Sequence, residues 1–212
     1  VLPAYLMGLN ILKLRSKILN CLEKRNQIFL KNSTLKLANI MKTKKCNNLI
    51  LLNYFPELNK FLEWCQQLIA ESLGKKNKGF LPVISSVPKD HHSLLQLYLD
   101  GPKDKIFYVF SSELKSNLKI KISKNIVADN VLNKKKLSEV KNAQKKSLIR
   151  SFVKKNILFR DLKIKKVNEE TLGNLFSFFI IETVIVGKLL NINPFDQPAV
   201  EQVKAYTKKY LT

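Results

Sequence analysis

Three short clusters of polar residues could carry acid–base chemistry, and the first lies near residue 71. If residues 56–74 form a helix, Gln67 and Glu71 are four positions apart and share a face beside its apolar stripe. A carboxylate at the edge of a core can have its pKa raised and act as a general base. The pattern alone favours the commoner case, an ordinary exposed glutamate near a helix end.

The second cluster is the segment Asp90-His91-His92-Ser93, at an expected helix start with Asp90 as its N-cap. The positive end of the helix dipole disfavours a protonated imidazole in the first turn. A histidine that stays neutral there can exchange a proton near pH 7. A pair of surface histidines is the simpler account of the same residues.

The third cluster includes Gln197 and Lys204, which are seven positions apart and so share one face of a final helix expected from about Phe195. Lys204 borders the apolar side of that helix, where its stem could pack while its amine reaches a pocket. A lysine that only covers the surface fits the pattern better. The expected core stripe of this helix consists of Val200, Val203, Tyr206 and Tyr210.

The elements that must position these clusters alternate between strands and helices. Apolar runs predict strands at 48–53, 79–86, 105–111 and, as an edge strand, 162–167; helical patterns cover 35–41, 56–74, 91–99, 137–155 and the region from 171. This order predicts an α/β fold with a mostly parallel sheet covered on both faces. Ligands of such sheets bind at the carboxyl ends of strands, so the junction at 85–92 either offers free N–H groups to an anion or is only a turn.

Two further segments have a distinctive composition. Residues 172–190 are apolar enough to imitate a membrane span, but Glu182 and Lys188 would be costly in lipid. They predict a buried helix of a soluble core. Residues 115–138 are rich in lysine and asparagine and predict a surface excursion.

The composition predicts one globular domain with an unusual charge. The chain has 212 residues, 45% of them hydrophobic, and a formal net charge of +22. Only four basic residues are arginine, and the lysines are scattered along the chain. Proteins that bind nucleic acids use the planar guanidinium group of arginine for bidentate hydrogen bonds to bases and phosphates. Compositional bias and a solvated surface therefore explain the charge better than nucleic-acid binding. Such a surface would still attract a small anionic substrate.

Cysteine and histidine are too few and too dispersed for a metal site. Cys21, Cys46 and Cys65 are widely spaced and odd in number, and only two histidines are present. Reduced thiols in a cytoplasmic protein are the expected state. The chain begins at Val1, without a methionine, which suggests a fragment or a processed chain.

Taken in order, the clusters resemble the glucose-6-phosphate isomerase family over most of the chain. Two of the family's motifs are Glu71-Ser72-Leu73-Gly74-Lys75 and Phe195-Asp196-Gln197, the latter followed by Val200-Glu201 and Lys204. Further matches are His92, Gln96 and Gly101, and then Leu172-Gly173-Asn174-Leu175 and Glu182. Pro198 and Ala199 depart from the family's pattern, which has an aromatic residue and a glycine at these positions.

The resemblance implies a fold and a reaction. The fold would be a three-layer α/β/α sandwich of the SIS sugar-isomerase type, with a subdomain at about 30–165 and C-terminal helices at about 168–212. The N-terminal half, which holds the family's phosphate loop and Gly-Gly-Arg segment, would be absent. The reaction would interconvert glucose 6-phosphate and fructose 6-phosphate through a cis-enediol, in glycolysis and gluconeogenesis, without metal or organic cofactor.

The resemblance also implies roles for five residues. Glu71 would be the base that moves the proton, His92 would assist ring opening in the partner's site of a homodimer, and Lys204 would contact the ring oxygen or hydroxyls. Gln67 and Gln197 would line the site. The expected partner is a sugar phosphate, with neither nucleic acid nor membrane. Two alternatives are a non-catalytic sugar-phosphate-binding SIS-type domain and a lysine-rich RNA-binding protein.

Overall fold

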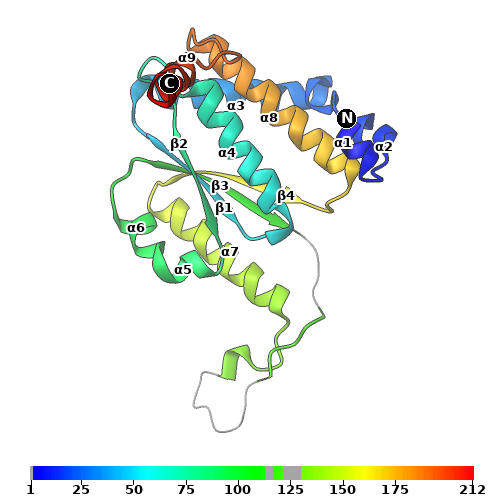
Figure 1. The fold of residues 1–212 in the computed structure, drawn as a ribbon. Helices are drawn as coiled ribbons and strands as arrows, with labels where there is room; N and C mark the ends of the chain where they lie inside the picture. Colours follow the sequence, from blue (N-terminus) through cyan, green and yellow to red (C-terminus); the bar gives the residue numbers. More distant parts are fainter. Residues whose placement is uncertain (1, 113–116, 122–129) are drawn as a thin grey trace. The chain divides into compact units, whose positions relative to one another are not determined.

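The computed structural model describes residues 2–112, 117–121 and 130–212 (Figure 1). The chain divides into two compact units. The helical unit comprises Val1–Asn47, Glu63–Pro82 and Asn168–Thr212, and the sheet unit comprises Asn48–Leu62 and Val83–Val167. The predicted subdomain boundaries near 165 stay a prediction.

The central sheet has the strand order β2-β1-β3-β4. Its strands are β1 (Asn48–Asn53), β2 (Leu81–Ser86), β3 (Lys105–Ser112) and β4 (Leu158–Ile164). β1 runs parallel to β3 with Asn48 opposite Lys105, and β3 runs parallel to β4 with Ile106 opposite Leu158. The predicted strands are confirmed, and β4 lies at the edge as expected, although it begins at Leu158 rather than at 162.

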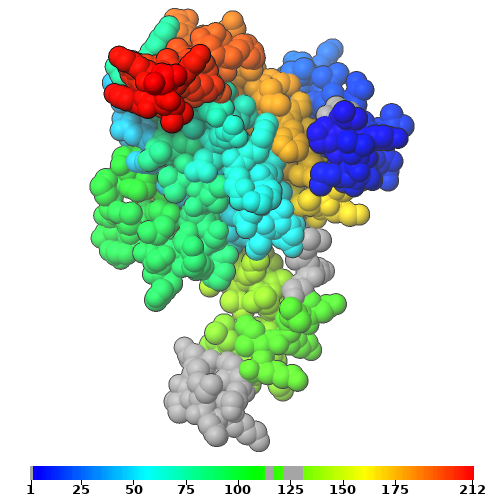
Figure 2. All heavy atoms as spheres, viewed as in Figure 1, coloured from blue at the N-terminus to red at the C-terminus, as the bar shows by residue number. Residues whose placement is uncertain are grey.

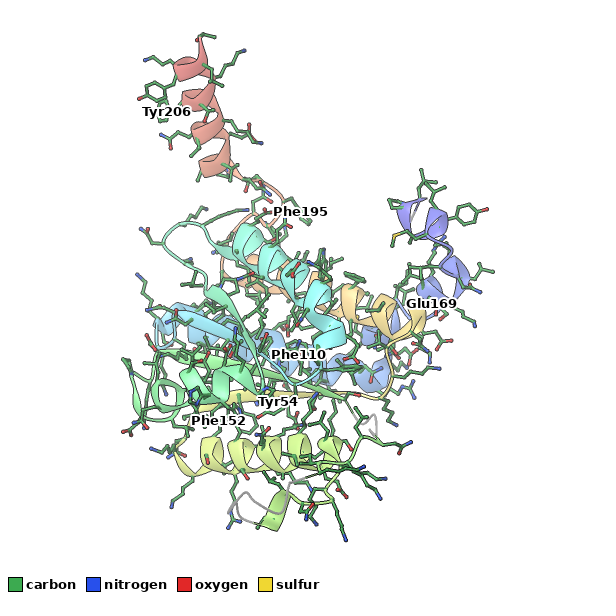
Figure 3. All side chains as sticks on the ribbon, turned by 60° about the horizontal axis from the view of Figure 1, so that its bottom comes forward. Tyr54, Phe110, Phe152, Glu169, Phe195 and Tyr206 are labelled. Carbon is green, nitrogen blue, oxygen red and sulfur yellow. The ribbon has the colours of Figure 1, made fainter. Side chains whose placement is uncertain are left out.

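Both faces of the sheet are buried. On one face Ile50, Leu52, Phe107 and Val109 form a core cluster with Phe152 of α7 (Leu137–Lys154), which Figure 3 labels. The Phe107 and Phe152 rings lie 4.6 Å apart. The alternate residues on the opposite face are also at most 1% exposed: Leu49, Leu51, Tyr108 and Phe110. A parallel sheet covered on both faces is the predicted α/β sandwich, which is therefore confirmed.

The sheet unit's short helices differ from the prediction at one point. The pattern predicts one helix over 91–99, but these residues form α5 (Lys89–Ser93) and α6 (Leu95–Asp100), interrupted at Leu94. Pro88 takes the N-cap position, and Asp90 is instead buried with its carboxylate accepting a 2.8 Å hydrogen bond from the Ser86 N–H. The N-cap assignment of Asp90 was wrong, because its side chain binds the strand end before the helix.

Further helical segments follow the strands. The turn η2 (Pro56–Leu58) leads into α4 (Asn59–Leu73), as the pattern at 56–74 predicted. The turn η3 (Asn130–Leu132) precedes α7, whose predicted range is confirmed. Within the expected surface excursion, Lys119 and Lys136 form an isolated antiparallel bridge; residues 115–116 and 122–129 lie outside the described residues.

The helical unit gathers helices from distant parts of the chain. It contains α1 (Leu2–Leu6), α2 (Ile11–Ser16), η1 (Asn20–Leu22), α3 (Lys24–Thr43), most of α4, α8 (Glu169–Leu189) and α9 (Pro198–Leu211). The helix expected at 35–41 is part of the longer α3. α8 packs against α2 and α3, and Trp64 of α4 meets Phe176 of α8 edge to face at 4.5 Å.

The apolar helix α8 is long and apolar enough to cross a membrane by length and composition, and 33% of its apolar window is buried inside the protein. Its Glu182 is only 3% exposed, and the Ser33 hydroxyl of α3 donates a hydrogen bond to that carboxylate. Burial and the charge of Glu182 together raise the pKa of Cys65 on α4. The three cysteines are buried as thiols.

The final helix α9 departs most from the prediction. It begins at Pro198, three residues later than expected, and none of its residues is buried (the red segment in Figures 1 and 2). The predicted core stripe of Val200, Val203, Tyr206 and Tyr210 is 42–86% exposed. Its assignment to the core was wrong for this chain, because an amphipathic pattern predicts a helix face but not what covers it.

Candidate active site

The site includes the last turn of α4 and the loop that follows it, in which Gly79 lies against the backbone of Leu73 and Gly74. Glu71 is half-buried there, and α4 ends at Leu73 before Gly74. A Cβ at Gly74 would lie 2.5 Å from the Ala70 carbonyl oxygen, so a side chain at that position would clash with the helix backbone. Gly79 has φ +115°, in the region that favours glycine. The turn that follows α4 therefore requires glycine at positions 74 and 79.

Two side-chain amides hold the Glu71 carboxylate. Gln197 Nε2 donates a 2.8 Å hydrogen bond to Oε2, and Gln67 Nε2 donates a 3.0 Å hydrogen bond to Oε1. An ionised carboxylate only accepts hydrogen bonds, so both amides must turn their NH₂ groups toward it. The structure thus brings together three of the five predicted site residues, and two of them lie 126 positions apart in the chain.

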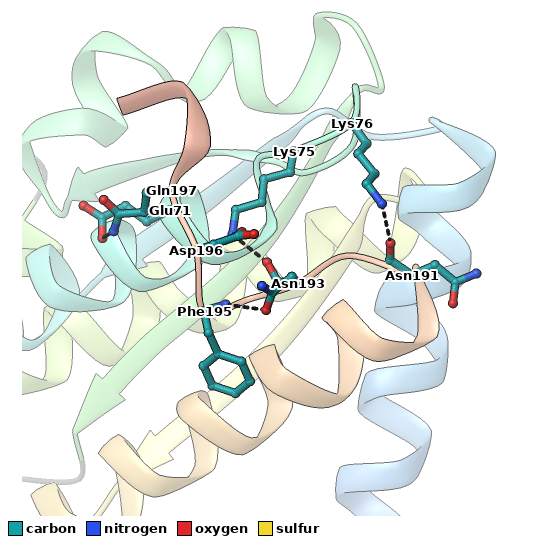
Figure 4. Close-up of polar contacts among 8 residues, drawn as sticks. All are labelled: Glu71, Lys75, Lys76, Asn191, Asn193, Phe195, Asp196 and Gln197. Atoms are coloured by element: carbon teal, nitrogen blue, oxygen red, sulfur yellow. Dashed lines mark hydrogen bonds and ion pairs between the residues drawn. The ribbon is translucent and has the colours of Figure 1, made fainter. Parts of the chain in front are cut away.

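Lysines that follow α4 hold the segment that carries Gln197 (Figure 4). Lys75 Nζ donates to the Asn193 carbonyl oxygen at 2.6 Å and pairs with Asp196 Oδ1 at 3.0 Å. Two neighbours donate to earlier carbonyl oxygens of the same segment: Lys76 to Asn191 at 3.2 Å and Lys78 to Leu190 at 2.8 Å. We call Leu190–Gln197 with these three lysines the lysine clamp.

The ion pair in the lysine clamp changes the chemistry of Asp196. The hydrogen bond from Lys75 is the main cause that holds the pKa of Asp196 below its usual range. The Lys75 side chain is only 12% exposed, whereas that of Asp196 is 51% exposed. The Lys75 cation is therefore paired within the clamp.

An open cavity of about 740 Å³ adjoins this arrangement. Ala70, Glu71 and Lys75 line it from the α4 side, and Asn193, Asp196 and Gln197 line it from the other. Pockets that hold small ligands have volumes of roughly 300–1,000 Å³. A carboxylate with a fixed orientation at the wall of such a cavity can exchange a proton with a bound small molecule.

The structure does not bring Lys204 to this carboxylate. Its side chain is 65% exposed and pairs with Glu201 at 2.7 Å, on α9. Gln197 is the N-cap of α9, and seven residues of helix rise about 10 Å, so Lys204 lies about two turns further along that helix. The predicted role of Lys204 stays a prediction.

The two histidines of α5 have different surroundings within the sheet unit. His91 Nε2 lies 2.9 Å from the Tyr54 hydroxyl, and the two rings meet edge to face at 5.5 Å. Burial lowers the pKa of His91, against an opposing effect of the Asp90 charge. His92 is exposed, which leaves its ring accessible to a neighbouring molecule. The Ser86 N–H at the same junction donates to the Asp90 carboxylate and is therefore not free for an anion, one of the two alternatives that the sequence left open there.

Sequence reasoning missed the lysine clamp. Lys75 and Asp196 occur in the two family motifs, but no role was predicted from the sequence for either residue. A signal was present, because each stands directly beside a predicted site element: Lys75 after the helix end at Gly74, and Asp196 before Gln197. Nothing local indicates that the two side chains meet.

A doubly wound α/β sheet and a carboxylate oriented by two amides define an α/β protein that can present one base to a small polar ligand. No family model matches the chain. The chain is 34% identical to the glucose-6-phosphate isomerase of Mycoplasmopsis pulmonis over 100% of its own length and 51% of the relative's, and 38% identical to a probable glucose-6-phosphate isomerase of Methanococcus maripaludis over 77% and 36%.

Two solved structures have a fold similar to that of this chain. A hypothetical protein from Thermus thermophilus superposes with a TM-score of 0.81 at 25% identity, over 97% of this chain and 51% of that one. A glucose-6-phosphate isomerase from Chlamydia trachomatis has a TM-score of 0.73 at 16% identity, over 94% and 42%. The chain belongs to the glucose-6-phosphate isomerase family and spans about half the length of the curated relatives it matches.

Proposed function

We propose that the chain is part of an enzyme that interconverts glucose 6-phosphate and fructose 6-phosphate, with Glu71 as the base. The observation that carries the proposal is the hydrogen bond between Gln197 and Glu71. It joins two separate family motifs at one carboxylate, on the wall of a cavity large enough for a sugar phosphate. The relatives named above as glucose-6-phosphate isomerases support the same reaction.

The reaction needs only a proton to move between two neighbouring carbons. Glu71 removes the proton from C2 of the open-chain aldose, and the C2–H electron pair forms the C1–C2 double bond of the cis-enediol while the C1 oxygen gains a proton. The carboxylic acid then returns its proton to C1 as the C2 hydroxyl loses its own, which leaves the ketose. The amides of Gln67 and Gln197 keep both carboxylate oxygens oriented during the transfer.

The other groups of the proposed active site are not among the residues that line the cavity at Glu71. In a homodimer, the exposed His92 would reach the partner's site and assist ring opening. Lys204 would leave its exposed ion pair with Glu201 and contact the sugar ring when another part of the enzyme packs against α9. The phosphate-binding loop would belong to the part of the enzyme that this chain does not span. The enzyme would act in the cytoplasm, in glycolysis and gluconeogenesis.

The test is the substitution Glu71→Gln in a full-length form of the enzyme. We expect isomerisation to be lost while binding of glucose 6-phosphate remains, because the amide keeps the shape but cannot accept the proton. Glu63→Gln, two turns earlier on the same helix, is the matched control and should retain activity. Normal turnover by the Glu71→Gln enzyme would remove Glu71 as the base.

A second candidate is a non-catalytic domain that binds sugar phosphates. The position of Lys204, exposed and paired with Glu201, favours it, because Lys204 is one of the two catalytic groups expected in the chain's own site and is not among the residues that line the cavity near Glu71. That candidate predicts sugar-phosphate binding by the full-length form without any turnover, before any substitution is made.

A further inference from the structure

A second cavity, of about 370 Å³, lies in the sheet unit at the edge where β1 and β3 end. The residues directly after β1, Tyr54 and Phe55, form one wall with Pro56, and the last two residues of β3, Ser111 and Ser112, lie at its base. All of its lining residues belong to the sheet unit. None of them is one of the five predicted isomerase residues.

The topology of the sheet makes this edge a preferred place for a ligand. From β1 the chain moves to β2 on one side, and from β3 it moves to β4 on the other. The neighbouring strands β1 and β3 therefore form the switch point of the sheet, and α/β sheets bind ligands outside the carboxyl ends of the strands at such a point. The cavity occupies that position.

A buried lysine is among the residues that line the cavity. Lys145 reaches from α7 to the sheet, is 8% exposed, donates a 2.7 Å hydrogen bond to Ser111 Oγ, and pairs with Asp161 Oδ1 at 2.7 Å. The ammonium group has three hydrogens, and these two contacts use two of them. Asp161 holds the cation in place, and the Ser111 hydroxyl, which accepts from Lys145, keeps its own hydrogen to donate to a ligand.

A second lysine lines the same cavity one turn earlier on α7. Lys141 is half-buried, and among the residues that the structure describes no carboxylate pairs with it. Ser138 and Asn142 add further polar groups from the first turns of the helix, and Glu57 is the one carboxylate in the lining. Asp161 neutralises Lys145, so Lys141 is the lining lysine that no described carboxylate pairs with; together with the hydroxyl and amide donors it suits an anion better than a cation or a neutral molecule.

We propose that this switch-point cavity binds the phosphate group of a small phosphorylated metabolite. Lys141 contacts the phosphate as a direct charge, and Lys145 acts through Ser111 and the local field. The aromatic and proline wall at Tyr54–Pro56 packs against the body of the metabolite. The site does not depend on the proposed isomerase activity, because no lining residue is shared with the cavity at Glu71.

Titration of the 212-residue chain with inorganic phosphate, glucose 6-phosphate and glucose, at constant ionic strength, tests the proposal. We expect saturable binding of phosphate and of glucose 6-phosphate and none of glucose. Following backbone amide signals by NMR would place the phosphate shifts at Ser111, Ser112 and Ser138. A metabolite that binds by its phosphate should bind more tightly than inorganic phosphate, because the apolar wall adds contact area.

Three variants separate the site from general attraction to a lysine-rich surface. Lys141→Gln should weaken phosphate binding about tenfold, the typical effect of one charge-assisted contact. Lys146→Gln, the neighbouring exposed lysine of α7, is the matched control and should change it less than about twofold. Glu71→Gln should leave phosphate binding unchanged, so failure of this proposal and failure of the isomerase proposal give different results.

Two outcomes would overturn the proposal. One is the absence of saturable phosphate binding up to about 10 mM, which corresponds to only weak affinity. The other is binding that Lys141→Gln and Lys146→Gln weaken equally, since that is the behaviour of a diffuse positive surface. Because Lys141 is only half-buried and Lys145 is left intact, neither variant removes the buried ion pair with Asp161.

Discussion

Gln197 donates a 2.8 Å hydrogen bond to the Glu71 carboxylate across 126 positions of the chain. Two features stabilise this contact. The turn at Gly74 after α4 positions Glu71, and the lysine clamp positions Gln197. The orientation of the proposed base is therefore a property of two distant segments and not of α4 alone.

Loss of the Gln197 amide should weaken catalysis without changing the base itself. In a full-length form, Gln197→Ala should lower kcat/KM about 10- to 100-fold, because a hydrogen bond to a charged group contributes about 1.5–3 kcal/mol. Steady-state kinetics measures the effect. Gln202→Ala, in the exposed part of α9, is the control and should be close to the parent. Equal activity of both variants would contradict a role for the Gln197–Glu71 contact.

The lysine clamp should open at low pH. Lys75 holds the pKa of Asp196 below its ordinary value of 3.8, so the carboxylate is charged and the pair intact above that pH. As the pH falls through the lowered pKa, Asp196 is protonated and its contribution to the clamp is lost. Hydrogen exchange of residues 190–197, followed from pH 7 stepwise into the acid range below the ordinary pKa, should become faster than intrinsic rates predict once the pH has fallen through the lowered pKa.

A variant without the cation provides the control for the clamp. Lys75→Met should show fast exchange in residues 190–197 already at pH 7, because the contacts to Asn193 and Asp196 are both lost. Lys60→Met, on the first turn of α4, should leave that segment protected. If Lys75→Met and the parent exchanged alike at pH 7, the clamp would have no stabilising role.

Gly173 of α8 should be intolerant of any side chain. A Cβ there would lie 1.8 Å from the Leu14 carbonyl oxygen of α2, which is backbone and cannot rotate away. Gly173→Ala should lower the free energy of unfolding by about 1–3 kcal/mol or more, as overpacking does. Gly187→Ala on the same helix meets no atom closer than 3.4 Å and is the matched control. Urea denaturation of the two variants would show similar stability if α2 and α8 were not in close contact.

The burial of His91 should make stability depend on pH. Burial lowers the pKa of His91 below its ordinary value of 6.5, so the unfolded chain binds the proton more readily than the folded one. The free energy of unfolding should therefore be greatest above about pH 6.5 and decline as the pH falls below it. His91→Phe should flatten this decline between pH 7.5 and pH 5.5, whereas His92→Gln should leave it in place.

Much of the fold follows from local sequence patterns. β1 and α7 have nearly the bounds that apolar periodicity predicts, because a buried strand or an amphipathic helix records its own environment along the chain. The pattern failed where a side chain made a contact of its own. Asp90 binds the Ser86 N–H instead of capping a helix, and the helix expected at 91–99 is interrupted at Leu94.

The residues of the candidate site were predictable one by one, and their arrangement was not. Motif order selected Glu71, Gln67 and Gln197, and residue type alone was enough to name a base and two amides. The sequence by itself determined the strands, several of the helices and the chemistry that each motif could perform, because these depend on residue type and short-range periodicity. Only the tertiary structure decided that Lys75 holds the segment before Gln197, that Lys204 stays away from Glu71, and that the α9 stripe is exposed, because such contacts join residues whose separation in the chain carries no periodic signal.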